Sequence, residues 1–283
     1  MTLATARGRA VCFDRTKKQQ VLMQFASLGS GSKGNGLLVR SREGSRTTTV
    51  LIDCGFGPKE ALQRLQALDA APNEIDAILV THEHGDHFKG VYSLAGAHGI
   101  PVYLTRGTQR GTRMPVTRPV HLEFVAADHG FTIGDLSIMP VPVPHDAREP
   151  VQFVLDDGRC KLGVLTDLGH GSAHVIKSYS GLDALILECN HDPDLLARNE
   201  RYPPSLKRRV GGPFGHLSNG AAAQILADID CSRLKMLVAA HLSADNNRPE
   251  LAIQALVGVQ ALGAEDIWIA DQEKGLRWSP VRA

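Results

Sequence analysis

One short stretch of this chain constrains its fold more than any other. Residues 81–87 read Thr-His-Glu-His-Gly-Asp-His and directly follow the apolar run Ile75–Val80. A run of this length and composition is typical of a buried strand, so the polar stretch is expected where that strand ends. Imidazole and carboxylate groups are the ligands that zinc, manganese and iron take in proteins. We therefore interpret residues 81–87 as a metal site, and not as a solvated histidine-rich loop.

The composition allows one large core and argues against a membrane or secreted protein. Of the 283 residues, 43% are hydrophobic, and a layered α/β domain can reach this size. No apolar run approaches the roughly 18 residues of a membrane span, and residues 1–22 lack the apolar centre of a secretory signal. The five cysteines are far apart without a CxxC pair, which excludes a disulfide framework. We expect a cytoplasmic protein with no membrane partner.

The positive and negative charges of the chain are nearly balanced. Lysine and arginine together number 31, against 30 for aspartate and glutamate. Any binding of nucleic acid must therefore depend on a local basic patch.

Residues 1–22 are interpreted as a disordered extension, and residues 23–283 as a single domain.

Short apolar runs separated by turn residues predict a strand-rich α/β fold. Strands are expected at Leu22–Leu28, Leu37–Val39, Thr49–Ile52, Ile75–Val80, Ile100–Leu104, Lys161–Thr166, Ala184–Leu187 and Leu234–Ala240, and strand-rich segments at Val120–Ala126, Phe131–Val143 and Val151–Leu155. Helical spacing predicts helices at Pro58–Leu68 (with Leu62, Leu65 and Leu68 on one face), Phe88–His98, Asn219–Ile229 and Arg248–Leu262. A terminal hairpin is expected from Ile267–Ala270 and Gly275–Trp278. The strand–helix–strand order implies sheets with helices packed on them.

Polar residues of chemical interest follow several of the predicted strands. Sheet-based folds place their sites beyond the ends of strands, and the residues in question are Asp53, Asp167, Glu188 and His241. A pair of metal ions about 3.5–4 Å apart needs roughly seven or eight ligands. The stretch 81–87 supplies four of them, and three single residues farther along the chain fit the remainder: His145, Asp167 and His241.

These residues, in this order, resemble the metallo-β-lactamase superfamily. The resemblance is carried by the HxHxDH form of residues 82–87 together with Asp53, His145, Asp167 and His241. It implies an αββα sandwich, in which two mixed β-sheets are flanked by helices and the site lies at one sheet edge. By the same resemblance one ion is bound by His82, His84 and His145, and the other by Asp86, His87 and His241, with Asp167 bridging the two. Asp53 would hold the loop by hydrogen bonds to the ligands.

The implied ligands limit the choice of metal without deciding it. No cysteine is among them, so the site offers nitrogen and oxygen only, which suits two divalent ions of zinc or manganese and is compatible with iron. The second motif position is His84, where the flavodiiron type has glutamate, and this argues against a redox role.

The second half of the chain is similar to the nucleic-acid-processing branch of the superfamily, tRNase Z included. Its most similar group is the YycJ/WalJ-like one, through the segments Ser30–Asn35, Asn190–Asp192, Tyr202–Arg209, Gly215–Asn219 and His241–Asn247. This resemblance implies a 5′-to-3′ exonuclease acting on DNA, with a role in mismatch repair.

Phosphodiester hydrolysis needs an attacking water and a proton donor for the departing 3′-oxygen. Asp86 is expected to orient the water or to accept its proton. His216 is the candidate acid, because it is surplus to the seven ligands and precedes the helix expected from Leu217. Glu188 could orient His216. The alternatives are a capping residue for His216 and a plain strand-end carboxylate for Glu188.

Two further segments are candidates for contact with nucleic acid. The basic stretch could grip a phosphate backbone, and its members are Arg198, Arg201, Lys207, Arg208 and Arg209. The loop 29–36 could present its amides, with Ser32, Lys33 and Asn35, to a phosphate. Tyr202 and Phe214 are available for base stacking. The alternatives are a solvated face for the basic stretch, a tight turn for the loop, and core packing for the aromatic rings.

Three functions are weighed. The leading hypothesis is a dinuclear-metal phosphodiesterase that degrades DNA from its ends. A second reading is a small-molecule hydrolase of the thioesterase or lactonase type, against which the basic stretch counts. A third is a metal-stabilised module that binds nucleic-acid ends without turnover. The sequence leaves open the metal, DNA against RNA, polarity and a homodimer.

Overall fold

Both faces of the strands are apolar, and this decides how the chain is layered. In the strand Gly36–Glu43, Leu37 and Val39 join the core between two sheets, whereas Leu38 lies in a second core beneath helices. Successive side chains of a strand point to opposite faces, so the strand must be covered on both sides. The computed structural model describes residues 23–259 and 263–282. The expectation for residues 1–22 lies outside the described residues.

The first sheet has seven strands in the order β14-β1-β2-β3-β4-β5-β6. Strands β3 to β6 are parallel, and the pairs β14–β1, β1–β2 and β2–β3 are antiparallel. The strands are β1 (Met23–Gly29), β2 (Gly36–Glu43), β3 (Arg46–Ile52), β4 (Ala77–Leu79), β5 (Val102–Leu104), β6 (Leu122–Phe124) and β14 (Leu276–Pro280).

The second sheet also has seven strands, in the order β13-β12-β11-β10-β9-β8-β7. Strands β10 to β13 are parallel, and the pairs β7–β8, β8–β9 and β9–β10 are antiparallel. The strands are β7 (Phe131–Ile133), β8 (Leu136–Pro142), β9 (Val151–Asp156), β10 (Lys161–Leu165), β11 (Ala184–Glu188), β12 (Met236–Ala240) and β13 (Ile267–Ile269).

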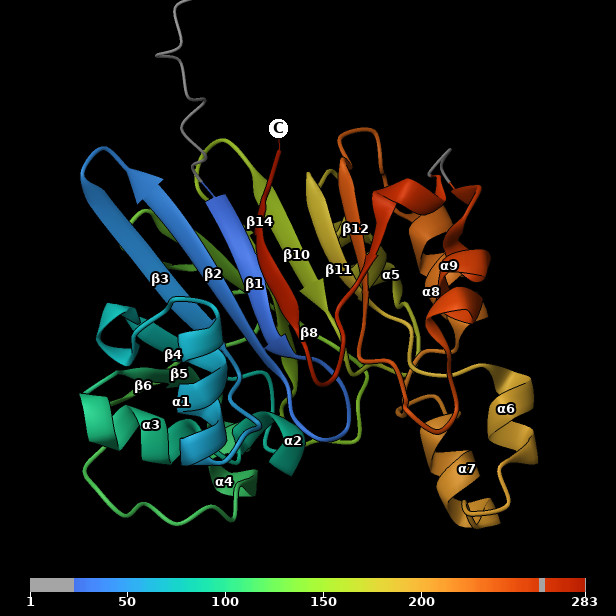
Figure 1. Cartoon of the computed structure of the whole chain (residues 1–283), viewed down its shortest axis with the longest axis horizontal. Helices are drawn as coiled ribbons and strands as arrows, with labels where there is room; N and C mark the ends of the chain where they lie inside the picture. The colour runs from blue at the N-terminus through green and yellow to red at the C-terminus, as the bar shows by residue number, and fades with distance from the viewer. Residues whose placement is uncertain (1–22, 260–262, 283) are drawn as a thin grey trace, which may run out of the picture.

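Helices cover the outer face of each sheet (Figure 1). The core outside the first sheet includes Ala61 and Leu65 of α1 and Leu94 of α3, and that outside the second includes Ile225 of α8 and Leu256 of α9. The predicted αββα sandwich with two mixed sheets is thus confirmed. The helices are α1 (Pro58–Ala67), α2 (Gly85–Phe88), α3 (Val91–His98), α4 (Arg106–Gly111), α5 (Ala173–Ser178), α6 (Pro193–Arg198), α7 (Pro204–Val210), α8 (Asn219–Asp228) and α9 (Pro249–Leu256), with 3₁₀ turns at Pro72–Glu74 and Ala264–Asp266. None of these helices is long and apolar enough to cross a membrane.

The predicted terminal hairpin is wrong. Gly275 donates its amide to the carbonyl of Asp271, so the expected turn does form. However, β13 pairs with β12 in the second sheet, while β14 pairs with β1 in the first. The turn residues predict the reversal, but the pairing partners are set by distant strands, and the last strand crosses to the other layer.

Several predicted elements are divided or shortened. The helix expected at Phe88–His98 is split into α2 and α3 at Gly90, whose missing side chain lets it approach Phe56: a Cβ would lie 2.2 Å from the Phe56 carbonyl oxygen. Residues 131–143, expected to be rich in strand, form the hairpin β7–β8. Helix α9 ends at Leu256, and residues 260–262 of the range predicted for it lie outside the described part. Leu62 is 41% exposed, so the inner face of α1 is formed by Ala61, Leu65 and Leu68.

Candidate metal centre

The site lies where strands of both sheets end. Asp53 follows β3, Asp167 follows β10 and His241 follows β12. All three have left-handed backbone, with φ of 61°, 54° and 55°. Residues other than glycine adopt this conformation at a cost of about 1–2 kcal/mol, and such strain concentrates at functional sites. The parallel strands therefore deliver these three side chains to one edge of the sandwich.

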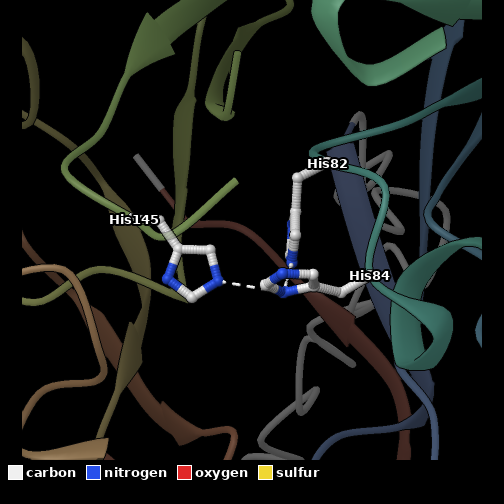
Figure 2. Close-up of side chains that lie close together, drawn as sticks. All are labelled: His82, His84 and His145. Atoms are coloured by element: carbon white, nitrogen blue, oxygen red, sulfur yellow. Dashed lines mark hydrogen bonds between the residues drawn. The ribbon is translucent and has the colours of Figure 1, made fainter. Parts of the chain in front are cut away.

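Three histidines from two different loops meet at this edge (Figure 2). His82 and His84 come from the loop after β4, and His145 comes from the loop after β8. The Nδ1 atom of His84 lies 3.0 Å from Nε2 of His82 and 3.2 Å from Nε2 of His145. One nitrogen of each ring lies within 4.8 Å of the others. The three residues that the resemblance assigns to one ion are thus placed together.

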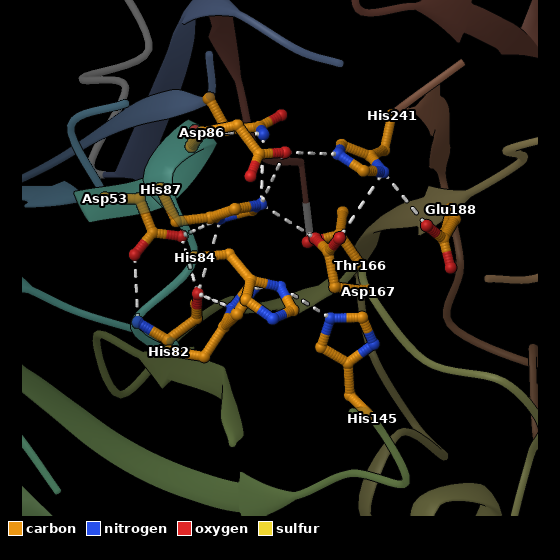
Figure 3. Close-up of polar contacts among 12 residues, drawn as sticks. Asp53, His82, His84, Asp86, His87, His145, Thr166, Asp167, Glu188 and His241 are labelled. Atoms are coloured by element: carbon orange, nitrogen blue, oxygen red, sulfur yellow. Dashed lines mark hydrogen bonds and ion pairs between the residues drawn. The ribbon is translucent and has the colours of Figure 1, made fainter. Parts of the chain in front are cut away.

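A second group forms beside the first (Figure 3). Oδ2 of Asp86 lies 3.7 Å from Nε2 of His87 and 3.6 Å from Nε2 of His241. The Asp167 carboxylate lies between His87 and His241. Its Oδ2 is 3.2 Å from His87 Nε2, and its Oδ1 is 3.5 Å from His241 Nδ1. Asp167 also forms a close group with His82 and His87. Its position next to both groups is the one that a bridging ligand requires.

The residues present fit a divalent metal by an observation independent of the motif. Asp167 Oδ2 and His241 Nε2 are buried and have no hydrogen-bond partner within the described residues. Buried polar atoms are normally satisfied, and at this site the two atoms without a hydrogen bond, which form ion pairs with His87 and Asp86, are both of the kind that binds metal. The donor set contains nitrogen and oxygen alone, which suits zinc, manganese or iron.

The charges of this cluster divide the histidines into two kinds. Burial lowers the pKa of His82 and of His145, which keeps their rings neutral, as metal binding requires. Burial acts the same way on His87 and His241, but nearby carboxylates, above all Asp167, more than offset it. They raise the pKa of His87 well above its usual value and that of His241 to about 10. This side of the centre stabilises positive charge.

Asp53 and Thr81 hold the histidine-rich loop. Asp53 accepts hydrogen bonds from the Thr81 amide (2.9 Å) and hydroxyl (2.7 Å), and its Oδ2 lies 2.8 Å from Nδ1 of His87. The Thr81 hydroxyl is also 2.9 Å from Nδ1 of His82. Each of these contacts engages Nδ1 of a histidine ring, so that Nε2 points toward the cluster. This is the usual support for a metal-binding histidine.

Glu188 and His216 form a pair against the second group. Oε1 of Glu188 lies 2.8 Å from Nδ1 of His216 and 3.0 Å from Nδ1 of His241, while Oε2 accepts from the amides of Leu168 and Leu217. Burial opposes charge on both residues. Their mutual attraction outweighs it, lowering the pKa of Glu188 to about 2 and raising that of His216. The N-cap of α8 is Ser218, so His216 precedes the helix and does not cap it.

A cavity of about 360 Å³ opens beside the centre. It is lined by Ser32, His84, Gly85, Asp86, Asp146, Asp167, Tyr202, Leu206, Arg209, Val210, Gly215 and His216. Sites for small ligands have volumes of about 300–1,000 Å³, so this cavity has room for a ligand about the size of one nucleotide. The segment Tyr202–Val210 forms one wall, and Figure 1 shows α7 at the end of the sandwich where α2 also lies.

The structure separates the predicted nucleic-acid contacts. Of the basic stretch, Arg209 lines the cavity, Arg201 pairs with Asp245, and Lys207 donates to the carbonyl of Ala197. No polar side-chain contact is found for Arg198 or Arg208 within the described chain.

The remaining candidates for nucleic-acid contact are placed differently. Ser32 lines the cavity, whereas Lys33 pairs with Glu273 and the amide of buried Asn35 reaches His87 Nε2 at 3.0 Å. Of the two aromatic candidates, Tyr202 lines the cavity and Phe214 is exposed outside it.

Sequence reasoning missed Asp146 at this site. Its Oδ1 lies 3.5 Å from His145 Nε2 and 3.9 Å from His84 Nε2, and its Oδ2 accepts from Arg209 Nε at 2.5 Å. Its position directly after His145 is the only signal in the sequence that could have found it.

Comparisons with known proteins agree with this geometry. A family model described as "Beta-lactamase superfamily domain" matches residues 48–241. The chain is 35% identical to the exodeoxyribonuclease YycJ of Bacillus anthracis over 232 residues, which cover 81% of this chain and 86% of that protein. It is 32% identical to the exodeoxyribonuclease WalJ of Streptococcus pneumoniae (serotype 2, strain D39) over 246 residues, covering 84% and 88% of the two chains.

A solved structure supports the fold alone. The metallo-β-lactamase fold protein YhfI of Bacillus subtilis superimposes with a TM-score of 0.68 at 19% identity, covering 88% of this chain and 96% of that one. The shared architecture therefore extends over nearly all of both chains.

Proposed function

Because the chain belongs to the metallo-β-lactamase superfamily, and within it to the YycJ/WalJ group, we propose that it removes nucleotides from DNA ends in the 5′-to-3′ direction. As a member of this group the chain is a metal-dependent hydrolase. The observation that carries the choice of a phosphodiester is the Glu188–His216 pair beside the metal-binding residues. The pair supplies a proton donor for the departing 3′-oxygen of a phosphodiester. A weakly basic leaving group would not need such a donor.

The proposed metal ligands are His82, His84 and His145 for one ion and Asp86, His87 and His241 for the other, with Asp167 between them. When bound, two divalent ions would supply activation of water and neutralisation of phosphate charge. The pKa of Asp86 falls to about 2, because His87 and His241 outweigh the effect of burial. Its carboxylate lies 3.7 Å from Nε2 of His87 and 3.6 Å from Nε2 of His241, and it would orient the attacking water or accept its proton.

His216 protonates the departing 3′-oxygen in this proposal. Its Nδ1 is held by Glu188, and its Nε2 has no hydrogen-bond partner among the described residues while the ring lines the cavity. A fixed ring with one available N–H is the geometry that a general acid needs. The raised pKa keeps that proton in place near neutral pH.

The remaining parts of the proposal concern the setting of the reaction. We propose zinc or manganese as the two ions and DNA in preference to RNA as the substrate. Arg198 and Arg208 would hold the phosphate backbone outside the cavity, with binding that weakens as salt rises. A role in repair, a cytoplasmic location, a homodimer and the single-domain organisation of residues 23–283 stay predictions from the sequence.

The test is a digestion of end-labelled single- and double-stranded DNA and RNA with each metal in turn. We expect release of mononucleotides from DNA with manganese or zinc. Asp167→Asn should reduce the rate at least 100-fold, since loss of a bridging ligand commonly costs metal or activity to this degree (roughly 10- to 100-fold even for outer contacts). The control Asp245→Asn, a surface carboxylate, should retain the rate.

Two results would contradict the proposal. Hydrolysis of thioesters or lactones without any release from nucleic acid would assign the chain to small-molecule chemistry. Tight binding of DNA ends without turnover under any divalent metal would make it a binding module.

A further inference from the structure

The cavity beside the metal centre contains one lysine or arginine among the side chains that line it, Arg209. Three carboxylates also face this space: Asp86, Asp146 and Asp167. Arg209 is therefore the one permanent positive charge that the described residues place at this wall. A guanidinium group in such a position is suited to a phosphate, because its planar fork can donate two hydrogen bonds at once.

The orientation of Arg209 is fixed by one contact that leaves most of its donors available. Its Nε donates to Oδ2 of Asp146 at 2.5 Å. No hydrogen bond is formed by its terminal nitrogens within the described residues, and the side chain is 60% exposed. Asp146 therefore holds the guanidinium from one side through this hydrogen bond.

The same contact sets the distance of Arg209 from the reacting centre. The other oxygen of Asp146 lies 3.5 Å from Nε2 of His145 and 3.9 Å from Nε2 of His84. The carboxylate thus stands between the guanidinium and two proposed metal ligands. A phosphate under attack must lie directly against the metal ligands, so Arg209 is one group too far out to be its main partner. Its free donors are therefore available to a neighbouring phosphate of the same strand.

The shape of the cavity agrees with a chain end. Tyr202 and Leu206 line the cavity together with Arg209, and all three belong to the single segment that closes one side. The hydroxyl of Tyr202 makes no hydrogen bond to the described residues, so the ring can contact a sugar or a base. A volume of about 360 Å³ beside such a wall has room for one terminal nucleotide.

We propose that Arg209 binds the 5′-terminal phosphate of the DNA, with Asp146 as the residue that positions it. The inference rests on the proposed exonuclease function and adds to it the group by which the end is recognised. Binding that phosphate places the next phosphodiester over the metal centre. The protein would thereby release one nucleotide at a time and prefer 5′-phosphorylated ends to 5′-hydroxyl ends.

The test compares kcat and KM for two single-stranded oligonucleotides of one sequence, one with a 5′-phosphate and one with a 5′-hydroxyl. The wild-type protein should prefer the phosphorylated end by roughly 10- to 100-fold in kcat/KM, the size expected for hydrogen bonds to a charged group. Arg209→Gln should remove this preference, mainly through a higher KM for the phosphorylated substrate. The matched control Arg208→Gln neutralises the adjacent arginine outside the cavity. It should lower kcat/KM for both substrates by the same factor.

The positioning role of Asp146 is tested separately. Asp146→Asn should reduce the preference for phosphate, and Asp146→Glu should restore part of it. The bound metal, measured by mass spectrometry, should be unchanged in both variants. A loss of metal in Asp146→Asn would overturn this role, because the residue would then act on the centre and not on Arg209.

The outcomes separate the inference from the function beneath it. If the wild-type protein degrades both oligonucleotides equally, or if Arg209→Gln retains the preference, the inference is overturned while the exonuclease function stands. An equal loss on both substrates in Arg209→Gln also overturns it, since Arg209 would then contact a phosphate common to the two. A wild-type protein that releases no nucleotide from either one overturns the function and the inference together.

Discussion

At the scale of single residues, the site uses histidine both for metal binding and for proton donation in the proposed reaction. His82 and His145 are buried among other imidazoles, and their pKa values are lowered. His216 faces the Glu188 carboxylate, and its pKa is raised although burial acts against the charge. A neutral ring can bind metal, whereas a protonated ring can donate a proton. The surroundings therefore separate His82 and His145 from the proposed acid His216, whereas the proposed ligands His87 and His241 have raised pKa values because Asp167 lies next to them.

The pH dependence of the reaction should change when Glu188 loses its charge. Glu188, with a pKa of about 2, is anionic throughout the neutral range and stabilises protonated His216. Glu188→Gln removes that stabilisation, so the pKa of His216 should fall. The acid form is then lost at lower pH, and the alkaline limb of the kcat profile should move down by about one unit. A profile measured on 5′-phosphorylated DNA checks this.

The control for this experiment is Asp245→Asn, which removes a surface carboxylate paired with Arg201. Its kcat profile should keep the wild-type shape. An alkaline limb that is unmoved in Glu188→Gln would show that Glu188 does not set the protonation of His216.

Much of the site could be predicted from the sequence at this scale, because the proposed ligands follow strands whose apolar runs are visible. Asp146 and Arg209 could not be predicted as a pair, since their contact joins the loop after β8 to α7. The engagement of Asn35 with His87 was equally hidden, because it depends on how the β1–β2 loop folds over α2. Contacts of this kind depend on tertiary packing and leave no spacing in the sequence.

At the scale of elements, the sequence indicates strands better than it indicates their partners. The apolar runs predict β9, β10 and β12 closely, because burial on both faces leaves continuous apolar residues. They do not predict that β13 and β14 belong to different sheets. Pairing depends on which distant strand already occupies an edge. The division of α2 from α3 at Gly90 has the same origin, since it follows from close contact with Phe56.

One contact between elements should be measurable in the stability of the sandwich. Tyr179, which follows α5, is buried and donates its hydroxyl to the carbonyl of Val164 in β10 at 2.7 Å. Tyr179→Phe should lower the free energy of unfolding by about 1–2 kcal/mol, the usual contribution of a buried hydrogen bond. Chemical denaturation of the two proteins measures the difference, and nuclease activity should persist.

Tyr92→Phe is the matched control for this change. Tyr92 is also buried, but its hydroxyl makes no hydrogen bond to the described residues. Its substitution should alter stability by less than about 0.5 kcal/mol. Equal effects in the two variants would mean that the Tyr179 hydrogen bond contributes nothing of its own.

At the scale of the whole molecule, the centre joins the two halves of the sandwich. The first sheet supplies the loop that contains His82, His84, Asp86 and His87, and the second supplies His145, Asp167 and His241. Neither sheet alone holds a complete set of ligands. Metal binding would therefore tie the sheets together, as it couples to folding in other proteins. The segment α6–α7 adds the cavity wall from outside this core.

The most direct test is an anomalous diffraction measurement on crystals of the manganese-loaded protein. We expect two peaks about 3.5–4 Å apart, with Asp167 next to both. One should contact His82, His84 and His145, and the other Asp86, His87 and His241. A different set of residues is also close enough to hold an ion: Asp167, Glu188, His216 and His241. A single peak within that set would contradict the proposed two-metal centre, because Glu188 and His216 would then be ligands and not the acid pair.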